Sequence, residues 1–208
     1  MPFLDPEQTV AFDRDGYLVL PGVFGEHEVA AMCADADFIL ELIVNSSPAN
    51  ELQSRRLDIR RKLDGTMYVR KIQPIVDLAL ALARFSADQR LLGPMSELMA
   101  DEPVLMEEKL NHKQPVPSME TSRVPADDDR FPVHNDWAYY KANGYPKGIV
   151  LSALTIDECH DGNGPIRVFP GTHKAAHRSP AGSATAWRCR RGPSTPTEVS
   201  LCWRRRGR

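Results

Sequence analysis

The chain has 208 residues and a hydrophobic content of 42%, which is enough for one domain with a buried core and leaves room for a tail. No apolar run approaches the roughly 18 residues of a membrane-spanning helix, and no basic-then-apolar leader opens the chain, so we expect a cytoplasmic protein that engages no membrane. The net charge of −2 indicates no class of partner, and four widely spaced cysteines without a CxxC pair exclude the common zinc pattern and a dense disulfide framework.

The N-terminal part of the chain has helical patterning. Gln8–Gly16 is predicted to form a short helix that ends at Gly16, followed by a strand at Tyr17–Leu20 that the Pro21-Gly22 turn closes. A long helix is predicted from Glu26 to about Asn45 because apolar residues recur there at helical spacing. The residues of this stripe are Val29, Met32, Ala36, Ile39, Leu40 and Ile43. We expect the stripe to belong to the core.

A charge-rich segment, Glu51–Gly65, follows the long helix. Its basic residues are Arg55, Arg56, Arg60, Arg61 and Lys62. We expect a solvated loop or helix face there, with a site for a phosphate or an acyl-carrier group as the alternative. Pro74–Phe85 is predicted as a second helix, and Ser86 with Gln89 matches a capping box for a further short helix.

From Pro103 onward the patterning changes from helical to extended. Strands are predicted at Pro103–Lys113, Phe131–Tyr140, Gly148–Thr155 and Pro165–Phe169, separated by polar or Gly- and Pro-rich links. Because the helices come first and the strands afterwards, the sequence predicts an α+β protein in which helices back an antiparallel sheet.

The predicted strand Phe131–Tyr140 holds His134 and Asp136 two residues apart. Side chains at i and i+2 of a strand point to the same face, so these two are expected to converge while Asn135 points away. An imidazole and a carboxylate suit iron(II), which the two-His-one-carboxylate arrangement binds with open positions for substrate and oxygen. The spacing also arises by chance, and the alternative is a half-exposed strand whose His and Asp are solvated or bonded to each other.

Three further segments give this motif a context. They are DGYLVLPGVF at Asp15–Phe24, LNHKQP at Leu110–Pro115 and GNGPIRVFPGTHK at Gly162–Lys174. Together with the His-x-Asp pair, and in this order, they resemble the phytanoyl-CoA dioxygenase family of iron(II)- and 2-oxoglutarate-dependent oxygenases. The resemblance implies N-terminal helices packed on a double-stranded β-helix (jelly roll).

The same resemblance implies roles for individual residues. His134 and Asp136 would be catalytic as the first two ligands of Fe(II), and the presence of a carboxylate at position 136 favours hydroxylation over halogenation. Lys113 would contact the cosubstrate 2-oxoglutarate; Lys109 is a rival on the same strand face, and a plain surface charge is the alternative for Lys113. The implied partners are dioxygen and a small organic substrate, which would be hydroxylated. His173 of the PGTH signature is expected to be structural or pocket-lining.

The C-terminal segment 179–208 differs in composition from the rest of the chain. It contains seven Arg and one Glu with no Lys or Asp, a net charge of +6. We expect a domain over residues 1–178 and a basic tail over 179–208 that is disordered or results from a frame shift or altered splicing, which would leave the jelly roll incomplete at its C-terminus. Trp187 and Trp203 among the arginines are compatible with base stacking, but the Lys-free composition favours a frame change, so we expect no nucleic-acid partner.

This segment also bears on the metal site. The family's second metal histidine is expected on a strand well past the PGTHK motif, and His177 is too close to that motif for the role. Two protein ligands alone predict weak iron binding. The alternative function is therefore a non-catalytic, truncated or degenerate member of the family, at most a weak binding or interaction module.

Overall fold

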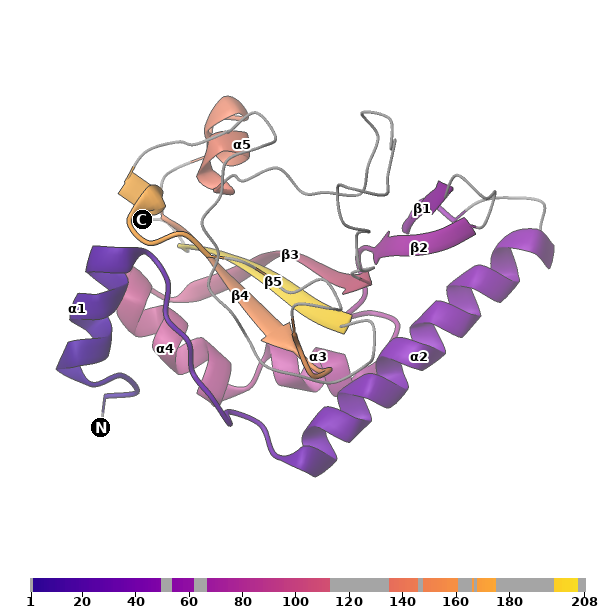
Figure 1. The fold of residues 1–208 in the computed structure, drawn as a ribbon, viewed down its shortest axis with the longest axis horizontal. Helices are drawn as coiled ribbons and strands as arrows, with labels where there is room; N and C mark the ends of the chain where they lie inside the picture. Colours follow the sequence, from indigo (N-terminus) through magenta and orange to yellow (C-terminus); the bar gives the residue numbers. More distant parts are fainter. Residues whose placement is uncertain are drawn as a thin grey trace.

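The computed structural model describes residues 2–49, 54–61, 67–112, 135–145, 148–160, 166, 168–174 and 197–205. The helices in these ranges are α1 (Pro6–Asp15), α2 (Glu26–Ala49), α3 (Leu80–Ser86), α4 (Gln89–Met99), α5 (Trp137–Ala142) and the 3-10 helix η1 (Thr172–Lys174). The strands are β1 (Leu57–Arg61), β2 (Met67–Ile72), β3 (Pro103–His112), β4 (Ile149–Thr155) and β5 (Thr197–Arg205). Figure 1 shows α2, α3 and α4 on one side of the sheet and α5 on the other. The predicted arrangement of helices backing an antiparallel sheet is confirmed.

The sheet joins strands that are far apart in the sequence. Its order is β1-β2-β3-β5-β4, and every neighbouring pair is antiparallel. Val199 of β5 pairs with Leu110 of β3 on one side and with Leu154 of β4 on the other. The yellow strand β5 therefore lies between β3 and β4 (Figure 1), and neither of these two strands pairs directly with the other.

Strand β5 falls inside the segment 179–208, for which the composition predicts a disordered or frame-shifted tail. The structure differs at Thr197–Arg205, where both edges of the strand are paired. The run TEVSLCW is rich in residues that favour strands, and its pairing with two neighbours outweighs the composition of the flanking arginines. The domain boundary at residue 178 stays a prediction, and residues 175–196 and 206–208 lie outside the described residues.

Helix α1 begins at Pro6, two residues before the predicted start at Gln8, and ends at Gly16 as predicted. The Asp5 carboxylate accepts a hydrogen bond from the Gln8 amide at 2.7 Å, and the Gln8 side chain accepts one from the Asp5 amide at 2.9 Å, which completes a capping box. Gly16 ends the helix with φ 81°, a left-handed conformation that glycine adopts readily. The predicted strand at Tyr17–Leu20 is wrong, since these residues have no strand structure in the described chain.

The core lies between α2 and the helix-covered face of the sheet. Met32 and Ile39 of α2 are fully buried, as are Ile72 of β2 and Leu110 of β3. The predicted stripe on α2 is confirmed, because all six of its members belong to this core or pack against it. Each large apolar side chain buried in this way contributes about 1.5–3 kcal/mol relative to exposure.

Three local predictions are wrong. The segment Glu51–Gly65 is not a loop or helix face throughout, because β1 lies within it and pairs with β2. The helix predicted from Pro74 begins only at Leu80, after a short turn segment. The cap of α4 is Asp88, whose carboxylate accepts from the Arg90 amide at 2.8 Å, and not Ser86, whose hydroxyl donates to the Ala83 carbonyl at 2.8 Å.

Two further comparisons concern the C-terminal strands. β3 and β4 confirm the strands predicted from Pro103 and Gly148. The strand predicted at Pro165–Phe169 is absent at the described positions Ile166, Val168 and Phe169. None of the helices in the described ranges combines the length and apolar content needed to cross a membrane.

Candidate active site

Asp136 is the one predicted site residue that the structure describes, while His134 and Lys113 lie outside the described residues. Asp136 has helical backbone angles, φ −62° and ψ −29°, and immediately precedes α5. Its carbonyl accepts a hydrogen bond from the Tyr140 amide at 3.0 Å. The strand predicted for Phe131–Tyr140 is therefore wrong from Asp136 onward. Alanine and lysine in the sequence WAYYKA favour the helix, so the argument from an extended strand does not apply at Asp136.

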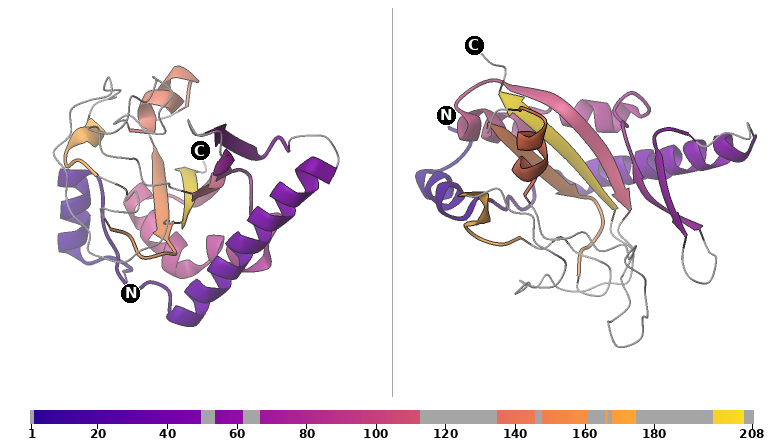
Figure 2. Two further views of the ribbon diagram at one scale, coloured as in Figure 1. Left: turned by 45° about the vertical axis from the view of Figure 1, so that its right-hand side comes forward. Right: turned by 90° about the horizontal axis from the view of Figure 1, so that it is seen from above.

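The face of β3 that points away from α2 carries a polar network. Glu107 accepts a hydrogen bond from the Tyr140 hydroxyl at 3.3 Å and forms an ion pair with Lys109 at 3.1 Å. Tyr140 in turn packs edge-on against Tyr145, with ring centroids 5.7 Å apart. Figure 2 shows α5 over this face of the sheet. The network therefore ties α5, and with it Asp136, to the middle of β3.

Positive charge gathers beside this network. Lys71 of β2 pairs with Asn111 of β3, two residues from Lys109. The pKa of Lys71 is lowered from its usual value, mainly by burial and next by the positive charge of Lys109. An anion placed near Lys71 would stabilise the charged form of this side chain. This end of the sheet is suited to a carboxylate ligand.

Asn135 connects Asp136 to the PGTHK motif. Its side-chain amide donates to the Thr172 carbonyl at 3.0 Å. The η1 turn that contains Thr172 also contacts the end of α1, because the Gly171 amide donates to the Asp15 carbonyl at 2.7 Å. The DGYL and PGTHK segments, which lie more than 150 residues apart in the chain, therefore meet next to the site.

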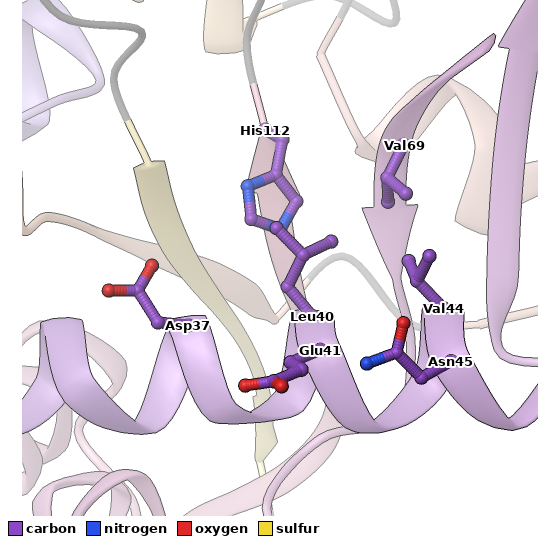
Figure 3. A pocket seen from close by; sticks show the side chains of 7 residues that line it. All are labelled: Asp37, Leu40, Glu41, Val44, Asn45, Val69 and His112. Atoms are coloured by element: carbon purple, nitrogen blue, oxygen red, sulfur yellow. The ribbon is translucent and has the colours of Figure 1, made fainter.

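A separate pocket lies on the opposite face of the sheet. It measures about 390 Å³ and is lined by Asp37, Leu40, Glu41, Val44, Asn45, Val69 and His112. Figure 3 shows His112 of β3 above the side chains of α2. The Nε2 atom of His112 is buried and has no hydrogen-bond partner in the part of the chain that the structure describes, and burial lowers the pKa of this imidazole. Because His112 points away from α5, this pocket is distinct from the candidate active site.

No cluster of three or more His, Cys, Asp or Glu side chains arranged to hold a metal ion occurs within the described ranges. The Nε2 atom of His173 lies 3.2 Å from the Asp13 carbonyl. The contribution of Glu107 was not anticipated from the sequence. Its position two residues before Lys109 on a predicted strand indicates a contact between the two, because side chains at this spacing share a face.

Two solved structures share this fold. The crystal structure of EctD from Sphingopyxis alaskensis with 2-oxoglutarate and 5-hydroxyectoine superposes with a TM-score of 0.67 at 22% identity, covering 98% of this chain and 71% of that one. The non-heme alpha ketoglutarate dependent epimerase SnoN from nogalamycin biosynthesis superposes with a TM-score of 0.65 at 14% identity, covering 96% and 82% of the two chains. The chain thus shares the fold of these two proteins.

The chain belongs to the phytanoyl-CoA dioxygenase (PhyH) family, whose model matches residues 12–205. It is 28% identical to an ectoine dioxygenase from Sphingopyxis alaskensis, over 82% of this chain and 50% of that protein. An ectoine dioxygenase from Halomonas elongata is 25% identical over 82% of this chain and 46% of the relative. The chain therefore spans about half the length of the curated relatives that it matches.

Proposed function

We propose that this protein is an iron(II)- and 2-oxoglutarate-dependent dioxygenase that hydroxylates a small organic substrate. The observation that carries the proposal is the family match over residues 12–205, which includes the His-x-Asp motif. The similarity to ectoine dioxygenases supports it, and makes ectoine the first substrate to test. In this proposal the sheet is part of a double-stranded β-helix, as in the family.

The proposed iron ligands are His134 and Asp136. Asp136 stands at the N-cap position of α5, so the start of this helix fixes the place of its backbone. A carboxylate and an imidazole are donors that iron(II) accepts in the facial arrangement. Iron bound there would supply the activation of dioxygen for oxidation of the substrate, with 2-oxoglutarate as the second source of electrons.

The described residues would hold and orient the cosubstrate. Lys109 is kept on the α5 side of β3 by Glu107 at 3.1 Å, and Lys71 adds a second positive charge on the same face. In this proposal either Lys109 or Lys113 binds a carboxylate group of 2-oxoglutarate, because an ammonium group is a compact point charge. Glu107 would hold Lys109 in position and join it to Tyr140.

The test is an anaerobic titration of the protein with Fe(II) and 2-oxoglutarate, followed by visible spectroscopy. The proposed function predicts the charge-transfer band of a chelated complex, and His134→Ala abolishes that band. His27→Ala, at an exposed position near the start of α2, serves as the matched control and retains it. A wild-type chain without the band would instead support the non-catalytic alternative.

A further inference from the structure

The end of α1 and the η1 turn pack tightly against each other. Gly16 lies beneath the ring of His173 so closely that a Cβ atom added at Gly16 would overlap the imidazole. The Nδ1 atom of His173 is buried and has no hydrogen-bond partner among the described residues, while Nε2 lies 3.2 Å from the Asp13 carbonyl. The ring therefore acts here as a packing group that fills the space above a glycine.

The η1 turn is held in shape by its own bonds as well. Gly171 adopts φ 79°, a left-handed conformation that favours glycine, and its amide donates to the Asp15 carbonyl at 2.7 Å. The Thr172 hydroxyl donates to the Phe169 carbonyl at 2.8 Å. These contacts fix the direction of the Thr172 carbonyl, which is the acceptor for Asn135 at 3.0 Å.

Asn135 stands between the two proposed iron ligands in the sequence. We propose that Gly16, Gly171, Thr172 and His173 form a latch that holds Asn135, and that Asn135 and His173 are positioning residues for His134 and Asp136. The latch rests on the proposed function only for the role of those two ligands; the packing itself does not depend on it. It gives the PGTH histidine a role in supporting the metal site from outside the set of ligands.

The latch acts by restricting the backbone on which both ligands stand. A single side chain that bonds to a fixed carbonyl limits the rotation of the residues on either side of it, so fewer ligand arrangements compete with the one that binds metal. Partners that orient metal ligands without touching the metal commonly change metal affinity by about 10- to 100-fold when they are removed. We expect Asn135→Ala to fall in that range.

The experiment compares Asn135→Ala, Gly16→Ala and Gly22→Ala in the full chain. Gly16 and Gly22 both have positive φ, 81° and 67°, but only a Cβ at Gly16 meets the His173 ring, while one at Gly22 meets nothing within 4 Å. Gly22→Ala therefore reproduces the backbone strain without disturbing the latch. The first readout is the Kd for Mn(II), used as an oxygen-stable probe, measured with 2-oxoglutarate present by electron paramagnetic resonance. The second is amide hydrogen exchange of residues 135–142 in the metal-free protein.

The latch predicts that Asn135→Ala and Gly16→Ala each raise the Kd for Mn(II) at least about tenfold, while Gly22→Ala leaves it within about twofold of wild type. It also predicts that the Tyr140 amide, which bonds to the Asp136 carbonyl, exchanges about fivefold faster in Gly16→Ala than in Gly22→Ala, the factor expected for one lost hydrogen bond. The thermal midpoints of the two glycine variants should match, which separates a local effect from a general loss of stability.

Two results would overturn the latch: wild-type affinity for Mn(II) in Asn135→Ala, or equal exchange at Tyr140 in the two glycine variants. A wild-type chain that binds no Mn(II) would count against the proposed function instead. In that case the exchange comparison still decides whether η1 controls the segment that begins at Asn135.

Discussion

Strand β3 sends alternate side chains into two different environments. Leu110 and its neighbours on the helix side enter the core, where Leu110 is fully buried. On the other side Glu107 and Lys109 form an ion pair and reach α5 through Tyr140. Alternate residues of β3 therefore contribute to the core on one face and to the polar surface below α5 on the other.

The polar groups on the two faces are satisfied in different ways. Glu108 on the helix side is 9% exposed and accepts hydrogen bonds from the backbone amides of Ile75 and Val76 at 3.3 and 3.4 Å. Glu107 bonds only to side chains among the contacts described above, and these can be rearranged when a ligand binds. Glu108, which supports the core, is thus bound by fixed backbone, whereas Glu107, beside the candidate site, is bound by movable side chains.

The largest expected effect lies on the α5 side. Asp136→Ala is expected to raise the Kd for Fe(II) by more than the roughly 100-fold that loss of a supporting residue can cost, and to remove the formation of succinate from 2-oxoglutarate. Unfolding by urea should change little, because Asp136 is not part of the core. A stability loss as large as that of a core variant, with metal binding retained, would contradict this division between the two faces.

A substitution in the core tests how much the helix-covered face of the sheet contributes to the free energy of unfolding. Leu110→Ala is expected to lower the free energy of unfolding by about 2–5 kcal/mol, through lost burial and the cavity that remains. Leu151→Ala on β4, where the side chain is 40% exposed, provides the control and should cost much less. Urea denaturation followed by circular dichroism measures both values. Equal losses in the two variants would show that the helix-covered face does not dominate stability.

Glu107 and Glu108 are neighbours in β3 but lie on opposite faces of the sheet, so their variants compare the two faces directly. Glu108→Ala leaves the backbone amides of Ile75 and Val76 without their acceptor and is expected to lower the free energy of unfolding by about 1–3 kcal/mol. Glu108→Gln should lower it less, because this side chain retains an oxygen acceptor. Glu107→Ala should cost less stability but raise the KM for 2-oxoglutarate, since Lys109 loses its partner. The same denaturation series and steady-state kinetics give the two readouts, and the reverse pattern would refute the assignment.

The smallest expected effect concerns pH. Burial lowers the pKa of His112 in the folded protein, against the opposing influence of Asp157 and Asp37, so the unfolded chain takes up a proton that the folded chain resists. The stabilisation is complete above the unfolded pKa of about 6.5 and is lost as the pH falls from there toward the folded value. His112→Leu should flatten the pH dependence of the urea midpoint below about pH 6.5, whereas the exposed variant His27→Gln should not.

Local patterning predicted much of the fold but not the sheet order. Helical spacing predicts α2, and Gly16 predicts the end of α1, because a helix makes its hydrogen bonds within a few residues. β5 was missed because its stability comes from β3 and β4, which no local pattern reveals. The sequence predicts a strand at α5 because its aromatic residues are common in strands, although its alanines and lysine favour a helix.

The sequence predicts single residues of the candidate site but not the contacts between them. The spacing of the His-x-Asp motif indicates Asp136, and the alternation of side chains along β3 indicates Lys109. The contacts of Glu107 with Tyr140 and of Asn135 with Thr172 depend on how distant segments pack. Such contacts cannot be read from spacing, because nothing in the sequence near Asn135 indicates that the PGTHK turn approaches it.

The central place of β5 has a consequence for biosynthesis. On the ribosome, β3 and β4 emerge well before Thr197–Arg205, so both must wait with an unsatisfied edge until that strand leaves the exit tunnel. Such late, long-range closure slows folding and leaves nascent edges open to association with other chains. Fast synthesis of this protein would therefore increase the number of chains whose β3 and β4 edges stay exposed before β5 has emerged.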